Sequence, residues 1–469
     1  MMTNDDFQEQ DRQRLLENYE VLEKDKRGNP TGSINYIRLA KLLYNADNQH
    51  YIVIKDNLDI LYYNGGYYEE NGENIINQRT QYYVGDNASE HIKKETVGWI
   101  RNNEYTEREK LNPPLNLINV KNGVLDINTS KLLPHNHKDL FLFQIPIDYI
   151  KKAKCKRWEK FIKDVLYQED IPFIQEVCGY LLYRGNLFAI IVILLGFGRN
   201  GKTTFIKTLS KVMGEENITH IPLHTIAKES YERAKLYGKH ANLCSEIGAS
   251  EIKDTSTLKS LTGNDPLSAR KLYHESFSFV NHAKLISSCN ILPEIGDRTY
   301  AMTERLAILE FPNRFERGSP ECDPNLYEKL TTPEELSGIF NWMLEGLKRL
   351  LKNNTFSKYR DFDNVTEYLK QSQDPVKIFV DTFIDSDPAF QIQKEIAYTK
   401  YRQFCIDHGY PTLNSVWFSR KFKQFGPLNM EEGQPRKGGH NRTWKGIKFK
   451  DGVDSLPINQ DSQDILEVQ

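Results

Sequence analysis

The sequence predicts an α/β fold with a parallel sheet at its centre, preceded by a smaller α+β region and followed by a further domain. Short apolar runs typical of buried strands recur between residues 188 and 311, with helical or loop stretches between them. One run ends in a glycine-rich loop that leads directly into a helix. The length of 469 residues exceeds what one hydrophobic core usually organises, so several domains are expected.

The overall composition is that of a folded chain. Hydrophobic residues make up 39% and charged residues 27%, which argues against wholesale disorder. A net charge of −2 excludes a general affinity for nucleic acid, so such binding must come from local basic clusters. The start of the sequence lacks the layout of a signal peptide, and no apolar run is long enough to span a bilayer. We therefore expect a cytoplasmic protein without a membrane segment.

The first 186 residues are predicted to form two regions, 1–111 and 112–186. In the first, a helical apolar pattern is followed by two strands and a Gly-containing turn. A pair of prolines at 113 and 114 breaks the chain before the second, which contains two short strands and a helical stretch. The expected elements are a helix at 34–43, strands at 51–54, 58–63, 117–120 and 123–127, and helical residues at 158–183.

The sheet-forming domain is predicted over residues 187–351. The strands of its parallel sheet are expected at 188–195, 241–245, 284–289 and 306–311. A polar stretch at 352–373 is interpreted as a linker, and a third domain is expected at 374–450. The remaining residues, 451–469, are rich in acidic groups and are expected to be disordered.

The glycine-rich loop at 196–203 has the full pattern G-x-x-x-x-G-K-T between a buried strand and a helix. Glycines let the backbone wrap around an anion, and the helix amino terminus adds a partial positive charge. The predicted ligand is the phosphate chain of ATP. Lys202 is expected to reach its terminal phosphates and Thr203 to ligate Mg²⁺. The predicted nucleotide-binding residues are Gly196, Gly198, Arg199, Asn200, Gly201, Lys202, Thr203 and Thr204.

A P-loop enzyme also needs an acidic residue at the end of a neighbouring strand. Glu246 ends the run at 240–245 and is predicted to polarise the attacking water and, with Thr203, to hold the metal. The residue before it is Ser245, where many such sites carry a second carboxylate. A solvated loop carboxylate is the alternative interpretation of Glu246.

Two further polar residues complete the predicted site. Asn290 ends a strand and could hydrogen-bond the γ-phosphate or the attacking water without adding charge. Arg305 precedes the last strand and is the candidate arginine finger, which would reach the γ-phosphate held by a neighbouring subunit. Arg298, in the loop between them, and a plain surface salt bridge are the alternatives.

These motifs, in this order, resemble the superfamily 3 helicases of small DNA viruses and, more closely, the poxvirus and phage or plasmid primase-helicase family. The resemblance extends over about residues 115–315 and rests on the segments 118–126, 196–204, 245–246, 258–266 and 290–311. It implies an ATP-driven hexameric ring that translocates on single-stranded DNA during replication of a virus, phage or plasmid. The only close carboxylate pair of the kind that priming needs, Asp361 and Asp363, is interpreted as a solvated turn. We therefore predict a helicase without a primase domain, with a separate primase as a candidate partner.

The resemblance also places a hairpin between residues 265 and 283, projecting into the channel of the ring. Lys271 and His274 match positions near its tip and are the predicted contacts to single-stranded DNA, with Tyr273 available for stacking. An ordinary surface hairpin is the alternative interpretation.

A second basic cluster lies at 416–450, where a helical stretch is followed by a basic turn and a return strand. This arrangement suggests a winged helix that binds duplex DNA, with a solvated charged face as the alternative. Its predicted DNA-binding residues are Arg420, Lys421, Lys423, Arg436, Lys437 and Arg442. The predicted fold class is thus an α/β P-loop ATPase with an AAA+-like parallel sheet, an α+β N-terminal region and a C-terminal winged-helix domain.

Two other functions remain compatible with the motifs. An ATP-switched origin-binding protein could remodel duplex DNA without processive unwinding. A small-molecule kinase could use the same P-loop, but it would leave the basic C-terminal cluster without a use.

Overall fold

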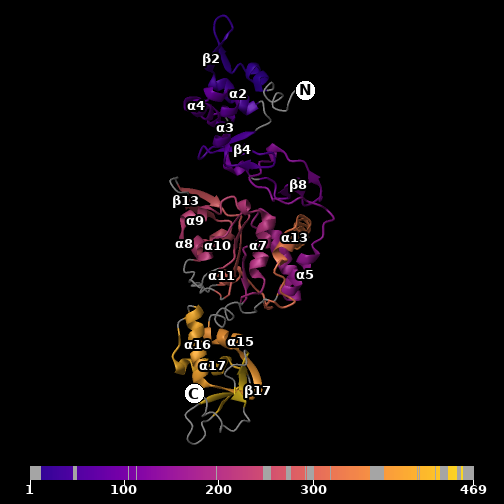
Figure 1. The fold of residues 1–469 in the computed structure, drawn as a ribbon, viewed down its shortest axis with the longest axis vertical. Helices are drawn as coiled ribbons and strands as arrows, with labels where there is room; N and C mark the ends of the chain where they lie inside the picture. Colours follow the sequence, from indigo (N-terminus) through magenta and orange to yellow (C-terminus); the bar gives the residue numbers. More distant parts are fainter. Residues whose placement is uncertain are drawn as a thin grey trace.

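The computed structural model describes most of the chain, with gaps at loops and at both ends. The described residues are 12–45, 50–103, 105–111, 113–196, 198–246, 255–270, 276–290, 292, 300–316, 318–359, 374–408, 410, 412–427, 429–433, 442–450 and 456–457. Figure 1 shows the N-terminal elements at one end of the molecule, the P-loop sheet in the middle and the C-terminal elements at the other end.

The N-terminal region is a small α+β unit, as the sequence predicts. Its four-stranded sheet has the order β5-β4-β3-β6, and Leu39, Leu42 and Leu43 of α2 are buried in the core beside it. The elements are β1 (Leu22–Lys24), β2 (Pro30–Ile34), α2 (Tyr36–Asn45), β3 (Tyr51–Ile54), β4 (Ile60–Tyr63), β5 (Tyr68–Glu69), α3 (Gly72–Val84), η1 (Gly85–Asn87), α4 (Glu90–Arg101), β6 (Tyr105–Thr106) and η2 (Arg108–Lys110).

A three-stranded sheet and two helices connect this unit to the P-loop. The strands are β7 (Leu117–Val120), β8 (Gly123–Asp126) and β9 (Leu132–Leu133), and the helices are α5 (Lys156–Val165) and α6 (Ile171–Tyr180), with η3 (His137–Asp139) and η4 (Gln168–Asp170) before them. The predicted helical stretch at 158–183 is therefore two helices. The buried Asn119 donates from Nδ2 to the carbonyls of Gly66 and Phe143 at 3.0 and 2.7 Å, which ties this sheet to the N-terminal unit.

The central sheet has five parallel strands in the order β11-β12-β15-β10-β16, so the predicted parallel α/β sheet is confirmed. All five residues of β10 are buried, which explains why the sequence reads as one apolar run. The strands are β10 (Ile191–Leu195), β11 (Ile218–Thr219), β12 (Ala241–Cys244), β15 (Lys284–Cys289) and β16 (Leu306–Glu310).

Helices cover both faces of this sheet (Figure 1). Val192 and Leu194 of β10 pack into the core formed with α5, α6, α7 and α13, while Ile191 and Ile193 point to the core on the other face. The remaining elements are α7 (Lys202–Met213), η5 (Glu215–Asn217), α8 (Leu223–Lys228), α9 (Ser230–Ala234), α10 (Ser256–Thr262), α11 (Tyr300–Thr303), α12 (Leu326–Leu330) and α13 (Pro333–Asn353). Because α5 and α6 share a core with the sheet, the stretches on either side of residue 186 pack as one unit.

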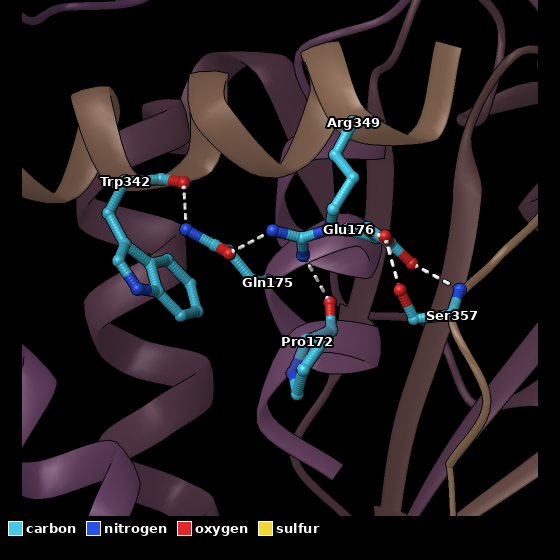
Figure 2. A network of polar contacts seen from close by, with 6 residues as sticks. All are labelled: Pro172, Gln175, Glu176, Trp342, Arg349 and Ser357. Atoms are coloured by element: carbon cyan, nitrogen blue, oxygen red, sulfur yellow. Dashed lines mark hydrogen bonds and ion pairs between the residues drawn. The ribbon is translucent and has the colours of Figure 1, made fainter. Parts of the chain in front are cut away.

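A buried carboxylate joins α6, α13 and the segment that follows α13 (Figure 2). Glu176 is fully buried, and its Oε1 accepts hydrogen bonds from Arg349 Nε at 2.6 Å and from Ser357 Oγ at 2.7 Å. The rings of Phe356 and Tyr359 also pack against Phe173. Residues 354–359, in the predicted linker, are therefore part of the packed unit, whereas 360–373 lie outside the described residues.

An antiparallel hairpin of β13 (Pro266–Arg270) and β14 (Ser276–Val280) leaves the central sheet between α10 and β15. Leu267 and Ala269 are buried while Ser268 and Arg270 are exposed, the alternation expected of a strand with one covered face. The hairpin that the resemblance implies is therefore present.

The C-terminal unit is built from three helices and a four-stranded sheet. In chain order these are α15 (Pro375–Phe383), β17 (Ile384–Gln393), α16 (Lys394–His408), α17 (Ser415–Phe425), β18 (Glu431–Gly433), β19 (Thr443–Phe449) and β20 (Leu456–Pro457). The sheet order is β18-β19-β17-β20, with antiparallel pairing throughout. Its aromatic core includes Phe379, Tyr401, Phe418, Phe422 and Trp444.

Candidate functional site

The loop after β10 has three residues with positive φ angles, Gly198, Arg199 and Gly201. Gly198 and Gly201 have φ angles of 65° and 87°, in the left-handed region that favours glycine. A Cβ on Gly201 would come within 2.7 Å of Val165 Cγ1 on α5. The loop is therefore held against α5 in a shape that depends on glycine at this position.

The buried Asn200 connects the loop to the segment that follows β16. Its side chain is buried, and Nδ2 donates to the carbonyl of Phe311 at 3.3 Å, just beyond β16. The carbonyl of the exposed Arg199 accepts from the amide of Phe315 at 2.8 Å. The predicted nucleotide-binding residues 199 and 200 are thus also the points at which the loop is attached to the end of the sheet.

Lys202 is the first residue of α7 and lies at the centre of this loop. Its ammonium group donates to the carbonyl of Gly196 at 2.5 Å, to Asn200 Oδ1 at 3.0 Å and to Asn290 Oδ1 at 3.2 Å. The side chain is 6% exposed, and burial lowers the pKa of Lys202 to about 8, although Cys289 and Glu246 nearby oppose that shift. The acceptors of this buried ammonium among the described residues are all neutral, which favours an incoming anion.

A cavity of about 290 Å³ lies beside Lys202. It brings together the loop, Glu246 and Asn290, which come from three separate parts of the sequence. The lining residues are Gly198, Arg199, Asn200, Gly201, Lys202, Thr203, Thr204, Ser245, Glu246, Ser288, Cys289 and Asn290. All predicted nucleotide-binding residues except Gly196 line it, and Gly196 contributes its carbonyl to Lys202.

Glu246 follows β12, but β12 is not the strand next to the P-loop strand. β15 lies between β12 and β10. The prediction that Glu246 follows a strand adjacent to the P-loop strand is therefore wrong, because one strand separates the two. Parallel strands end at the same edge of a sheet, which is why Glu246 still reaches the cavity. Its side chain is exposed there, as is that of Thr203. A hydroxyl and a carboxylate are hard oxygen ligands of the kind that Mg²⁺ accepts.

The sequence analysis missed Ser288 and Cys289, which end β15 and line the same cavity. Ser288 Oγ donates to the carbonyl of Ser245, so the ends of β15 and β12 are joined at the cavity wall. The only sequence signal is that two serines and a cysteine follow Leu285 and Ile286 in a buried strand.

Arg305 does not line this cavity. It immediately precedes β16, and its guanidinium donates to Thr262 Oγ1 at 3.2 Å and to the carbonyl of Ala301. Both acceptors belong to its own chain. The alternative finger, Arg298, lies outside the described residues.

The structure describes only part of the predicted DNA-binding set. Lys271, Tyr273 and His274 at the hairpin tip lie outside the described residues, as do Arg436 and Lys437. Arg442 is exposed at the start of β19, and its carbonyl accepts from the amide of Lys394.

Three predicted basic residues lie on α17 in different surroundings. Arg420 is exposed, and its guanidinium lies 5.0 Å from the ring centre of Trp417. Lys423 is exposed and forms a 3.5 Å surface pair with Glu432. Lys421 instead forms an ion pair with Asp374, which is 9% exposed and caps α15. Lys421 is therefore paired with a nearly buried carboxylate, whereas the carboxylate beside Lys423 is 48% exposed.

None of the helices in the described part of the chain combines the length and apolar character that crossing a bilayer requires.

The parallel sheet, the glycine-dependent loop and the buried lysine at a helix start define a mixed α/β domain of the P-loop type. Comparison with known families gives two matches. Residues 38–167 match the family described as D5 N terminal like, and residues 194–305 match a family of unknown function, DUF5906.

Among named proteins, the chain is 25% identical over 324 residues to "Putative primase C962R" of African swine fever virus, which covers 62% of this chain and 34% of that protein. It is 25% identical over 320 residues to "Putative helicase V13" of Sputnik virophage, covering 61% and 39%. It is 27% identical over 281 residues to "Putative helicase L207/L206" of Acanthamoeba polyphaga mimivirus, covering 54% and 29%. The aligned part is thus about a third of the length of these relatives.

Two segments of the chain therefore resemble the D5 N terminal like and DUF5906 families, and the chain is related to viral proteins named as putative primases and helicases. Among solved structures, the NrS-1 C terminal region is similar, with a TM-score of 0.46 at 10% identity, covering 88% of this chain and 100% of that chain.

Proposed function

We propose that this chain is an ATP-dependent, ring-forming DNA helicase that translocates on single-stranded DNA during replication of a virus, phage or plasmid. The observation that carries the proposal is the cavity at Lys202, which is lined by Thr203 from the start of α7, by Glu246 beyond β12 and by Asn290 after β15. The relatives named as helicases supply the class of activity.

In this proposal each residue of the cavity has a distinct task. Lys202 exchanges its neutral acceptors for the β- and γ-phosphates of ATP, and the backbone of the loop surrounds the phosphate chain. Glu246 orients the attacking water, and Asn290 holds the γ-phosphate or that water through its amide. Thr203 and Glu246 are the residues that would hold Mg²⁺, which neutralises charge on the phosphates when bound.

The proposed assembly is a ring, with six subunits as the expected number. Arg305 lies away from its own cavity and contacts only neutral acceptors in the described residues. It is the proposed arginine finger for the cavity of a neighbouring subunit.

DNA is proposed to contact two parts of the chain. The hairpin of β13 and β14 would present Lys271 and His274 to a single strand within the ring. The C-terminal unit has the order helix, strand, helix, helix and three strands, which supports its interpretation as a winged helix. Its exposed residues Arg420, Lys423 and Arg442 are the proposed contacts to duplex DNA, whereas Lys421 is paired with Asp374.

The proposed domains are an N-terminal α+β region at 1–111, a helicase-preceding domain at 112–186, the P-loop ATPase at 187–351 and the winged helix at 374–450. Because residues 354–359 pack against α6, the proposed linker is reduced from 352–373 to 360–373, and the acidic tail of 451–469 completes the proposal.

The test is ATP turnover and strand displacement by Lys202→Ala, with Lys207→Ala as a matched control. Both lysines are on α7, but Lys207 is exposed and lies outside the cavity. We expect Lys202→Ala to lose both activities while unfolding at the same temperature as the wild type, and Lys207→Ala to keep both. Turnover at the wild-type rate by Lys202→Ala would refute the site. ATP turnover by the wild type without displacement of a tailed strand would favour an ATP-switched remodelling protein instead.

A further inference from the structure

Arg305 and Thr262 are joined by a side-chain hydrogen bond that links the edge of the central sheet to the base of the hairpin. Arg305 Nε donates to Thr262 Oγ1 at 3.2 Å, and the other end of the guanidinium is held by the carbonyl of Ala301. None of the described carboxylates pairs with Arg305. A guanidinium held by neutral oxygens can be drawn away by a phosphate, because a phosphate adds the attraction of opposite charge and can accept two parallel hydrogen bonds.

The position of Thr262 makes it sensitive to whether the Arg305 guanidinium is bound to it. It is the last residue of α10 and is 6% exposed. Its hydroxyl donates to the carbonyl of Leu258 at 3.0 Å within the helix, so the oxygen lone pairs face Arg305. Loss of Arg305 would leave a nearly buried hydroxyl without its donor, which costs free energy unless the end of α10 moves.

The end of α10 is tied to both strands of the hairpin. Asn281, just after β14, donates from Nδ2 to the carbonyl of Leu261 at 2.9 Å, and Asn186 donates from Nδ2 to the carbonyl of Asn281 at 2.7 Å. Asn264, just before β13, donates from Nδ2 to the carbonyl of Asn186 at 2.8 Å. A shift of the end of α10 is therefore passed to the root of both strands.

We propose that Thr262 is a positioning residue that couples Arg305 to the hairpin of β13 and β14. The inference rests on the proposed role of Arg305 as the finger for a neighbouring subunit. When the neighbour holds ATP, Arg305 leaves Thr262 for the γ-phosphate, and the hairpin root changes position. Coupling is reciprocal, so a single strand that displaces the hairpin weakens the hold on Arg305 and releases it for catalysis.

The test compares ATP turnover with and without an oligothymidylate strand in four variants. Thr262→Val keeps the branched shape of the side chain but removes the acceptor, and Thr262→Ser keeps the hydroxyl. Thr257→Val makes the same substitution at a buried position of the same helix that does not contact Arg305. Asn264→Gly removes an exposed tie at the hairpin root, and glycine suits its φ of 62°.

We expect Thr262→Val to raise turnover without DNA and to lower the stimulation by DNA about tenfold, the effect of losing one hydrogen bond to a charged group. Thr262→Ser and Thr257→Val should behave as the wild type. Asn264→Gly should also lower the stimulation by DNA. Because Asn264 is exposed, this variant provides the test if Thr262→Val does not fold. If DNA stimulates ATP turnover as in the wild type in whichever of Thr262→Val and Asn264→Gly folds, the proposed coupling between Arg305 and the hairpin is overturned.

Arg305→Ala, assayed in parallel, separates this outcome from failure of the proposed function. If Arg305→Ala hydrolyses ATP normally, the finger itself is wrong. If Arg305→Ala is inactive while Thr262→Val and Asn264→Gly respond to DNA as the wild type does, only the coupling through Thr262 is wrong.

Discussion

Lys202 and Asn290 meet at the cavity, where the lysine ammonium donates a 3.2 Å hydrogen bond to the amide oxygen of Asn290. The two residues are 88 positions apart in the sequence, and adjacent parallel strands bring them together. This contact links the residue proposed to bind the phosphates with the residue proposed to sense them.

ATP binding should weaken at alkaline pH. Burial lowers the pKa of Lys202 to about 8 in the protein without nucleotide. The charged form, which pairs with phosphate, therefore predominates below pH 8 and is lost above it. We expect the affinity for ATP to fall between pH 8 and pH 9.5, by up to roughly tenfold per pH unit. Calorimetric titration at several pH values measures this. In Lys202→Arg, whose guanidinium stays charged, any remaining affinity should not change over that range.

Glu246→Gln should bind ATP but hydrolyse it more slowly by several orders of magnitude. The substitution removes the charge that orients water and leaves the loop and Lys202 in place. Binding of a fluorescent ATP analogue and release of phosphate are measured on the same sample. Retained binding of the analogue is the control, because it shows that the nucleotide site is intact. Turnover near the wild-type rate would show that a different carboxylate acts as the base.

Salt dependence should distinguish the lysines of α17. Lys423 is exposed and pairs only with the half-exposed Glu432 among the described residues, whereas Lys421 pairs with the nearly buried Asp374. Each lost phosphate contact lowers the slope of log affinity against log salt concentration by about one. We expect Lys423→Gln to reduce the slope for duplex DNA and Lys421→Gln, the matched control, to leave it unchanged. A wild-type slope in both variants would remove this face of α17 from the DNA interface.

The network in Figure 2 should contribute strongly to stability. Arg349→Ala leaves the fully buried Glu176 without its cation, which should cost about 3 kcal/mol, since Ser357 still donates two hydrogen bonds to the carboxylate. Arg157→Ala is the control, because Arg157 is largely exposed and lies 4.0 Å from Glu335. Denaturant unfolding of the two variants measures the difference. A cost below about 1 kcal/mol for Arg349→Ala would contradict this account.

Local patterns predicted the elements that position the site. β15 was predicted with its observed bounds, as a short strand-like run that contains Leu285 and Ile286 and ends before Asn290. The helix after the glycine-rich loop was also predicted, but α7 begins within the motif, at Lys202. Contacts between distant residues could not be predicted in this way. Lys421 has the same helical spacing as its neighbours, and only the packing of α17 against α15 shows that it pairs with Asp374. The same holds for Arg305 and Thr262, 43 residues apart.

The central claim is that active sites form between subunits, so mixing two inactive variants tests it most directly. Lys202→Ala lacks the phosphate-binding lysine, and Arg305→Ala lacks the proposed finger. In mixed rings, some interfaces pair an intact cavity with an intact finger, which is worth roughly 10³–10⁵ in rate. We predict that the mixture hydrolyses ATP although neither variant does so alone. Mixed rings that form, as shown by co-purification of two tags, but remain inactive would contradict the account.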